Sequence, residues 1–202
     1  SLARGAAGRA RLVTLRVGVL ALQGDFREHA AVVGALGAEP VLVRAPEHLE
    51  GVDRLVLPGG ESTTIGKLAE RYELLQPLRH LIAAGVPTLG TCAGLILLSA
   101  STTGDHQPLL GVLDVVVERN AYGSQVDSFE ADIEVQGMAG PLRAVFIRAP
   151  RIDKVGRGVE ILARYDGHPV VVRQGNIWAT SFHPELTPDG RLHTLVLDSG
   201  ER

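Results

Sequence analysis

The chain has 202 residues, of which 45% are hydrophobic and 21% charged, with a formal net charge of −3. It is long enough to bury a hydrophobic core in one domain, and its charge gives no electrostatic footprint for nucleic acid. A single cysteine excludes an internal disulfide, no cluster of thiols or histidines suggests a metal site, and no apolar run has the length of a membrane span. We therefore expect a soluble cytoplasmic protein with no metal, cofactor, nucleic-acid partner or membrane.

Short apolar runs rich in Val, Leu and Ile alternate along the chain with stretches of helical periodicity. Residues 1–15 are expected to be a leader or a disordered arm, and residues 16–202 one domain. Strands are predicted at 16–22, 39–44, 54–59, 86–91, 144–149, 160–165, 169–175 and 177–182, and helices at 25–36, 62–84 and 93–100. Residues 109–140 contain strand material with polar turns, which predicts a small antiparallel extension. The fold class is therefore α/β, with a doubly wound, mostly parallel sheet flanked by helices.

The only cysteine, Cys92, lies where the strand at 86–91 is expected to turn into a helix. Residues 90–94 form the pattern G-x-C-x-G, the thiol counterpart of the nucleophile elbow. A helix beginning at Ala93 directs unpaired backbone N–H groups at the sulfur, which favours the thiolate, and the Ala93 amide is placed to donate to an oxyanion. A free cysteine is more often a small buried apolar residue, so the motif alone leaves both interpretations open.

A thiol nucleophile needs a base, and one histidine has a carboxylate at a suitable spacing. His183 and Glu185 follow the strand at 177–182, and residues two apart in an extended backbone share a face. The pair is consistent with a base and its orienting group, or with a solvent-exposed turn. Chemistry in a doubly wound sheet gathers at the carboxyl ends of strands, where both Cys92 and His183 are expected. The remaining histidines are expected on the solvated surface; they are His29, His48, His80, His106, His168 and His193.

Two adjacent glycines, Gly59 and Gly60, come at the end of the strand at 54–59. Glycine pairs at this position let backbone amides approach a substrate closely, and residues 61–64 are suited to cap the next helix. An ordinary turn with an N-cap explains the same residues.

Three segments in this order resemble class I glutamine amidotransferases with a Cys-His-Glu triad: PGGEST (58–63), GTCAGLILL (90–98) and SFHPELT (181–187). Three more are similar to the glutaminase subunits of pyridoxal 5'-phosphate synthases: VGVLALQGDFREH (17–29), VVVERNAYGSQVDSFEADI (115–133) and VFIRAPRI (145–152). The resemblance extends over roughly residues 16–198 and implies the class I glutamine amidotransferase fold.

The resemblance implies hydrolysis of L-glutamine to L-glutamate and ammonia through a glutamyl thioester on Cys92. His183 would act as acid and base, Glu185 would orient it, and Gly60 and Ala93 would supply the oxyanion amides. The ammonia would pass to a synthase (lyase) subunit that makes pyridoxal 5'-phosphate (vitamin B6), in a large hetero-oligomer.

The resemblance also implies a set of substrate-binding residues: Gly60, Glu61, Ser62, Arg119, Ile147 and Arg148. A planar guanidinium suits the α-carboxylate of glutamine. Gln23, just after the first strand, is expected near the partner interface and the oxyanion peptide.

Two features depart from the family pattern, and three alternatives remain. The leader before Arg16 has no counterpart, and the chain stops at a point where the family usually continues into a fuller terminal helix. The alternatives are a cysteine peptidase or chaperone-like hydrolase, a glutaminase of another pathway such as histidine synthesis, and a non-catalytic binding module. The first is disfavoured because the related hydrolases have G-x-C-H-G at the elbow and Ala93 stands here; the second would not be expected to carry residues 119–132.

Overall fold

A seven-stranded sheet forms the centre of the computed structural model, which describes residues 13–119 and 128–200. Its strand order is β10-β11-β12-β4-β3-β1-β2. The bounds are β1 (Arg16–Leu20), β2 (Glu39–Val43), β3 (Arg54–Leu57), β4 (Thr88–Thr91), β10 (Glu160–Tyr165), β11 (His168–Gln174) and β12 (Ile177–Thr180). The strands β2, β1, β3, β4 and β12 pair in parallel, whereas β11 is antiparallel to both of its neighbours. The mostly parallel sheet predicted from the sequence is confirmed.

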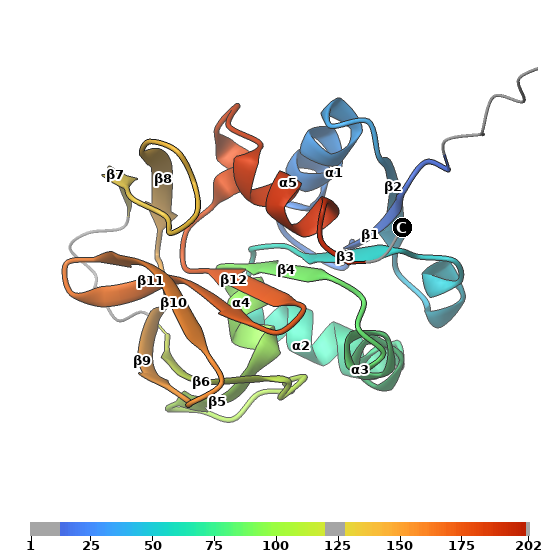
Figure 1. The fold of residues 1–202 in the computed structure, drawn as a ribbon. Helices are drawn as coiled ribbons and strands as arrows, with labels where there is room; N and C mark the ends of the chain where they lie inside the picture. Colours follow the sequence, from blue (N-terminus) through green and yellow to red (C-terminus); the bar gives the residue numbers. More distant parts are fainter. Residues whose placement is uncertain (1–12, 120–127, 201–202) are drawn as a thin grey trace, which may run out of the picture.

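Helices cover both faces of this sheet (Figure 1). On one face lie α1 (Phe26–Ala35) and α5 (Arg191–Leu197), and on the other lie α2 (Ser62–Arg71), α3 (Leu75–Ala83) and α4 (Ala93–Leu98). Two short 3₁₀ helices complete the set, η1 (Pro46–Leu49) and η2 (Pro184–Leu186). The doubly wound arrangement is therefore confirmed, and in the described residues no helix is both long and apolar enough to cross a membrane.

Two smaller sheets form the expected extension. One contains β5 (Ser99–Thr103), β6 (Leu113–Glu118) and β9 (Arg151–Val155), and the other is the antiparallel pair of β7 (Ser128–Ile133) and β8 (Leu142–Ile147). The stretch 109–140 supplies only β6 and β7 of these. In the first small sheet β5 pairs with β6 in parallel, so the extension is larger and less uniformly antiparallel than predicted.

The single helix predicted over 62–84 is wrong, because the structure divides it into α2 and α3. Glu73, between the two helices, has a left-handed backbone with φ of 57°, and the N–H of Leu74 donates to the carbonyl of Ala69. The buried positions explain the break. They follow a helical spacing up to Ala69 and again from Leu74, but these two are five positions apart instead of three or four. The extra residue is accommodated by the turn.

Four other elements differ from the sequence prediction. The helix predicted over 93–100 ends at Leu98, because Ser99 turns into an extended conformation and its hydroxyl donates to the carbonyl of Ile96 at 2.7 Å. The strands β5 and β9 were not predicted, and neither was α5. Of the expected leader, residues 1–12 lie outside the described part of the chain, as do residues 120–127 of the segment that carried the family resemblance.

Candidate active site

A cavity of about 520 Å³ opens at the carboxyl ends of β1, β3, β4 and β12. These are the strand ends at which a doubly wound sheet places its ligands. The residues that line the cavity are Asp25, Gly60, Glu61, Ser62, Cys92, Ala93, Ile96, Arg119, Ile147, Arg148, Pro150, His183 and Leu186. Among the site residues predicted from the sequence, only Gln23 and Glu185 do not line it.

Cys92 occupies the turn between β4 and α4, as the sequence predicted. Its backbone has φ of 51° and ψ of −104°, a strained conformation for a residue with a side chain, and its N–H donates to the carbonyl of Thr180 at 2.9 Å. A Cβ on Gly94 would lie 1.8 Å from the carbonyl oxygen of Leu57, so the turn packs too tightly for any other residue there. The elbow thus depends on glycine and holds Cys92, 7% exposed, at the cavity wall.

His183 and Glu185 form a buried hydrogen-bonded pair. Nδ1 of His183 lies 2.5 Å from Oε1 of Glu185, and the two residues are 4% and 6% exposed. The exposed His-Pro-Glu turn that the sequence left open is therefore excluded. The backbone N–H of His183 donates to the carbonyl of Val145 at 2.8 Å, and the preceding Phe182 packs on Phe146 of β8 with ring centroids 5.5 Å apart.

A second carboxylate, that of Asp25, reaches the same imidazole nitrogen at 3.2 Å. Burial lowers the pKa of His183, but hydrogen bonds to Asp25, Cys92 and Glu185 and the charge of Cys92 outweigh it and raise the pKa to about 12. The pKa of Asp25 is lowered, chiefly by its hydrogen bond to His183. Burial raises the pKa of Glu185, against the lowering effect of the hydrogen bond and charge of His183. The site therefore favours an imidazolium between carboxylates.

The side chains of Cys92 and His183 converge on Gly59. A Cβ on this glycine would lie 2.4 Å from Cε1 of His183 and 3.3 Å from Cβ of Cys92. Only a residue without a side chain fits between them, so Gly59 permits the thiol and the imidazole to share one corner of the cavity.

The peptide after Gly59 is tied to the loop that follows β1. The side-chain oxygen of Gln23 accepts a hydrogen bond of 2.7 Å from the backbone N–H of Glu61, and the N–H of Asp25 donates to the carbonyl of Gly59 at 2.9 Å. A Cβ on Gly60 would lie 2.4 Å from the same Gln23 oxygen. The conformation of the predicted oxyanion peptide therefore depends on Gln23.

Glu61 serves as the N-cap of α2. Its carboxylate accepts hydrogen bonds from the backbone N–H groups of Thr63 and Thr64 at 3.2 and 2.6 Å. The Thr64 hydroxyl also donates to this carboxylate. That hydrogen bond, followed by the two backbone bonds, lowers the pKa of Glu61. The side chain is exposed at the cavity while it also stabilises the helix terminus.

Arg119 lies across the cavity and is oriented by polar neighbours. Its Nη1 donates to Oγ1 of Thr63 at 2.7 Å and to Oε1 of Gln107 at 2.8 Å, and the Ser62 hydroxyl donates to the same Gln107 oxygen at 3.2 Å. The buried Nε of Arg119 has no hydrogen-bond partner in the described residues. An arginine fixed on one edge is suited to bind a carboxylate with its other nitrogens.

The strand β8 contributes the remaining wall. The Cys92 thiol donates to the carbonyl of Ile147 at 3.9 Å, and the Ile147 side chain is 38% exposed. Arg148 has a left-handed backbone with φ of 43°, unusual for a residue other than glycine. Backbone strain of this kind often occurs where a side chain is positioned for function.

Two of the histidines expected on the surface are buried, which corrects that prediction. His29 is fully buried and His193 is 1% exposed, and their rings bond to each other between α1 and α5. His48, His80 and His106 are exposed as expected, and His168 is half-buried.

Asp25 and Gln107 were missed by the sequence analysis. Asp25 lies two residues after Gln23 in the segment ALQGD, and its place at the start of the expected first helix was the available signal. Gln107 lies in a loop without regular structure, and no sequence pattern connects it with Arg119.

Asp25, His183 and Glu185 are the one group of potential metal ligands found in the described residues, with ligand atoms within 4.8 Å of one another. The histidine nitrogen in this group, Nδ1, already bonds to the two carboxylates. The set therefore serves imidazole positioning, and the expected absence of a metal stays a prediction.

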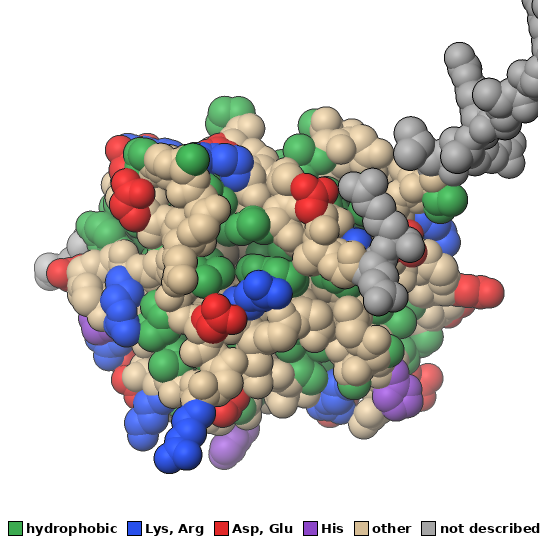
Figure 2. Space-filling model, in the orientation of Figure 1, with side chains coloured by type: hydrophobic (Ala, Val, Ile, Leu, Met, Phe, Trp, Pro, Cys, Tyr) green, Lys and Arg blue, Asp and Glu red, His purple; other side chains and the backbone are tan. Residues whose placement is uncertain are grey.

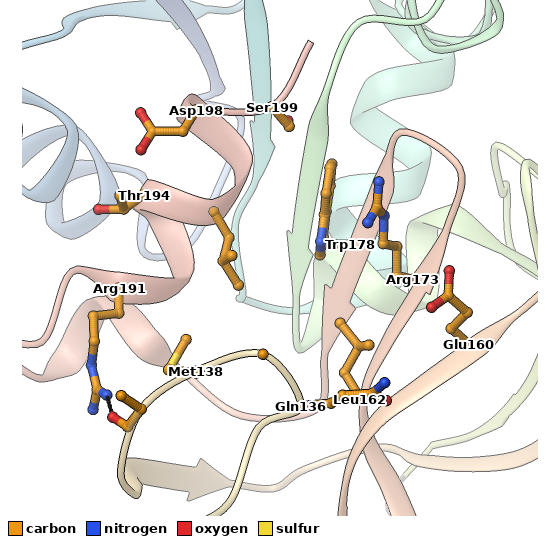
Figure 3. A pocket seen from close by; sticks show the side chains of 13 residues that line it. Gln136, Met138, Glu160, Leu162, Arg173, Trp178, Arg191, Thr194, Asp198 and Ser199 are labelled. Carbon is orange, nitrogen blue, oxygen red and sulfur yellow. Dashed lines mark hydrogen bonds between the residues drawn. The ribbon is translucent and has the colours of Figure 1, made fainter.

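A second cavity, of about 650 Å³, is formed by α5, the loop between β7 and β8, and strands β10 to β12. Figure 2 shows a hollow with hydrophobic side chains in this region of the surface. Arg173 lies over the ring of Trp178, 4.5 Å from its centroid, with Glu160 on the next strand (Figure 3). None of the predicted site residues lines this cavity.

Comparison with known proteins identifies relatives of the whole described fold. The SNO glutamine amidotransferase family matches residues 19–201. A protein of Frankia casuarinae named pyridoxal 5'-phosphate synthase subunit PdxT is 59% identical over 187 residues, covering 91% of this chain and 94% of that protein. A Mycobacterium tuberculosis protein of the same name is 54% identical over 188 residues, covering 91% and 95%.

Solved structures agree with this assignment. A crystal structure of a glutamine amidotransferase is similar with a TM-score of 0.85 and 54% sequence identity, covering 90% of this chain and 97% of that one. The PurLQS structure from Thermotoga maritima is similar with a TM-score of 0.72 at 18% identity, covering 92% and 98%, which shows a shared fold.

Proposed function

Because the chain belongs to the SNO glutamine amidotransferase family, we propose that it is the glutaminase subunit of a pyridoxal 5'-phosphate synthase. It hydrolyses L-glutamine to L-glutamate and ammonia, and the ammonia is used for vitamin B6 synthesis. The observation that carries the proposal is that Cys92, on its strained elbow, and His183 line one cavity, while the buried Glu185 bonds to the His183 imidazole.

The reaction proceeds through a covalent intermediate. The Cys92 thiol gives its proton to His183, and Sγ attacks the side-chain amide carbon of glutamine, forming a C–S bond and a tetrahedral oxyanion. The C–N bond then breaks, and His183 gives its proton to the departing ammonia. Water attacks the resulting glutamyl thioester while His183 takes the proton of the water, and cleavage of the C–S bond releases glutamate and restores the thiol. The raised pKa of His183 supports its role as the acid of the first half.

Two backbone amides are proposed to bind the oxyanion, those of Gly60 and Ala93. Ala93 is the first residue of α4, where backbone N–H groups have no intrahelical partner. Gly60 belongs to the peptide held by Gln23, so its orientation is adjustable from the surface loop. An oxyanion donor of this kind contributes roughly 3 kcal/mol to transition-state stabilisation.

The glutamine head group is proposed to bind at the opposite wall of the cavity. Arg119, with Nη1 held by Thr63 and Gln107, and Arg148 bind the α-carboxylate, and Ile147 contributes its backbone. Glu61 and Ser62 at the start of α2 lie within the same cavity and complete the head-group site.

The ammonia acceptor is proposed to be a separate synthase (lyase) subunit in a hetero-oligomer. Free ammonia is mostly protonated at neutral pH, so direct transfer to a partner protects its nucleophilicity. The loop containing Gln23 is proposed to lie at this interface, where a contact would reach the Gly60 amide. The single buried thiol suits a reducing compartment, and the cytoplasm is proposed.

The test is to measure glutamate release by the purified chain alone and with the synthase subunit, in the presence of glutamine. We expect low release alone and a clear increase with the partner. No release under either condition contradicts the glutaminase assignment. Release that the partner leaves unchanged, with no complex formed, contradicts the partner and leaves the glutaminase assignment intact.

A further inference from the structure

Two buried histidines stand behind the proposed triad and have no role in the chemistry described above. His29 of α1 and His193 of α5 bond through Nδ1 of the first and Nε2 of the second at 2.8 Å. The other nitrogen of His29, Nε2, lies 3.1 Å from Oγ1 of Thr91 and 3.4 Å from Oε2 of Glu185. The side chains of both His29 and Glu185 are fully buried.

Oε2 of Glu185 needs a donor. Oε1 is engaged by His183, whereas Oε2 is buried and has no hydrogen-bond partner within the described residues. A buried carboxylate oxygen without a partner is costly, and the Nε2 of His29 faces it at a distance slightly longer than a formed hydrogen bond.

Both histidines are neutral at physiological pH. Burial, with the charges of His193 and His183 in second place, holds the pKa of His29 well below its usual value of 6.5. Burial also lowers the pKa of His193 to about 4. Each ring therefore carries one N–H, and two arrangements of these protons are compatible with the contacts.

In the first arrangement, His193 donates its Nε2–H to Nδ1 of His29, and His29 directs its Nε2–H at Thr91 and Glu185. The unsatisfied atom is then Nδ1 of His193, which has no partner in the described part of the chain and would carry only a lone pair. In the second, His29 donates from Nδ1, its Nε2 lone pair faces the carboxylate, and His193 has a buried N–H without an acceptor. An orphaned buried N–H is rarer and costlier than an unpaired acceptor, so the first arrangement is favoured.

We infer that His29, held in the Nε2–H tautomer by His193, is a positioning residue for Glu185. It directs an N–H at Oε2 of Glu185. The carboxylate therefore stays ionised, with Oε1 aligned on His183. The chain of contacts runs from α5 through α1 and η2 to the imidazole that serves Cys92. The kinetic consequence of this inference rests on the proposed glutaminase function.

The pH dependence of activity depends on the contact between His29 and Glu185. Three titratable groups face Glu185: His183 from its own segment, Asp25 from the N-terminus of α1 and His29 from within α1. Cys92 affects Glu185 through His183, and His193 affects it through His29. Loss of the His29 donor raises the pKa of Glu185 further, because burial then opposes ionisation with less compensation. If activity requires ionised Glu185, the acid limb of the pH–activity profile therefore moves to higher pH.

The kinetic test compares three variants in the complete complex with the synthase subunit and glutamine. In His29→Leu we expect kcat to fall on the order of tenfold with KM little changed, and the acid limb of kcat/KM to move to higher pH. His29→Gln, which retains a donor of similar reach, should recover most of the rate. Val33→Ala, at a buried position one turn along α1, removes packing without a polar contact and should lower the melting temperature without moving the limb.

An acid limb in His29→Leu that coincides with the wild-type limb overturns the inference, and so does an equal shift in Val33→Ala. A second measurement needs no variant and no activity. Nitrogen-15 chemical shifts of the histidine rings in the wild-type protein should show His29 and His193 both protonated at Nε2. Protonation of His29 at Nδ1 overturns the inference whether or not the chain proves to be a glutaminase.

Discussion

The side-chain oxygen of Gln23 accepts a 2.7 Å hydrogen bond from the backbone N–H of Glu61. A surface-loop residue thereby holds the peptide that contains Gly60, one of the two proposed oxyanion donors. The hydrogen bond from the N–H of Asp25 to the carbonyl of Gly59 fastens the same loop a second time. A protein that binds this loop would therefore act directly on the proposed oxyanion peptide.

Gln23→Ala should remove most of the stimulation of glutamate release by the synthase subunit, since the loop can no longer reorient the Gly60 amide. The expected loss is somewhat more than 100-fold if the whole donor, worth roughly 3 kcal/mol, is withdrawn. Glutamate release is measured with saturating synthase. Gln136→Ala, in the second cavity, is the control and should behave as wild type. Full stimulation of Gln23→Ala would show that the loop does not transmit the signal.

His183→Asn should nearly abolish turnover, whereas Glu185→Gln should be milder. The imidazole is the proton donor and acceptor, and the carboxylate acts through it with Asp25 still 3.2 Å from Nδ1. Steady-state kcat of both variants in the complex gives the comparison. Small and equal effects would remove the pair from the mechanism.

Arg119→Lys and Arg148→Lys should each raise KM for glutamine with kcat largely kept. A lysine ammonium is a point charge and cannot reproduce the planar donors of a guanidinium. For Arg119 the lysine also loses the orientation given by Thr63 and Gln107. If kcat falls while KM stays constant, these arginines act in the chemical step or in closure of the site.

Asp25→Asn should lower the pKa of His183 from about 12, because the hydrogen bond to Asp25 is the largest of the interactions that raise this pKa. The protonated imidazole is then lost at a lower pH, and the alkaline limb of kcat/KM moves down. Nitrogen-15 titration of His183 in the variant and the wild type measures the shift directly. A His183 titration that is identical in both proteins would mean that Asp25 does not share Nδ1.

The sequence predicted the parts of this site that are encoded locally. The elbow at Cys92 and the His183–Glu185 pair are each formed by residues close together in the sequence, directly after a predicted strand. Their spacing therefore predicted where they lie in the fold. The break between α2 and α3 was missed, because the apolar pattern over 62–84 resembles that of one long helix. Its only local signal is the separation of five positions between Ala69 and Leu74.

Long-range pairing could not be predicted in this way. His29 and His193 are 164 residues apart, and each sits in a segment with charged neighbours that is typical of a surface. They are buried because α1 and α5 cover the same face of the sheet. The strands β5 and β9 were missed for a similar reason, since they are defined by their pairing with β6.

The central claim is covalent chemistry at Cys92, and acid quenching of the working complex during turnover of glutamine tests it most directly. Mass spectrometry of the digested wild-type chain should find the peptide that contains Cys92 carrying a glutamyl group. Cys92→Ala should remain folded, because the thiol contributes little packing at its 7% exposed position, and should give neither the adduct nor glutamate. Continued glutamate release by a folded Cys92→Ala variant would contradict the account.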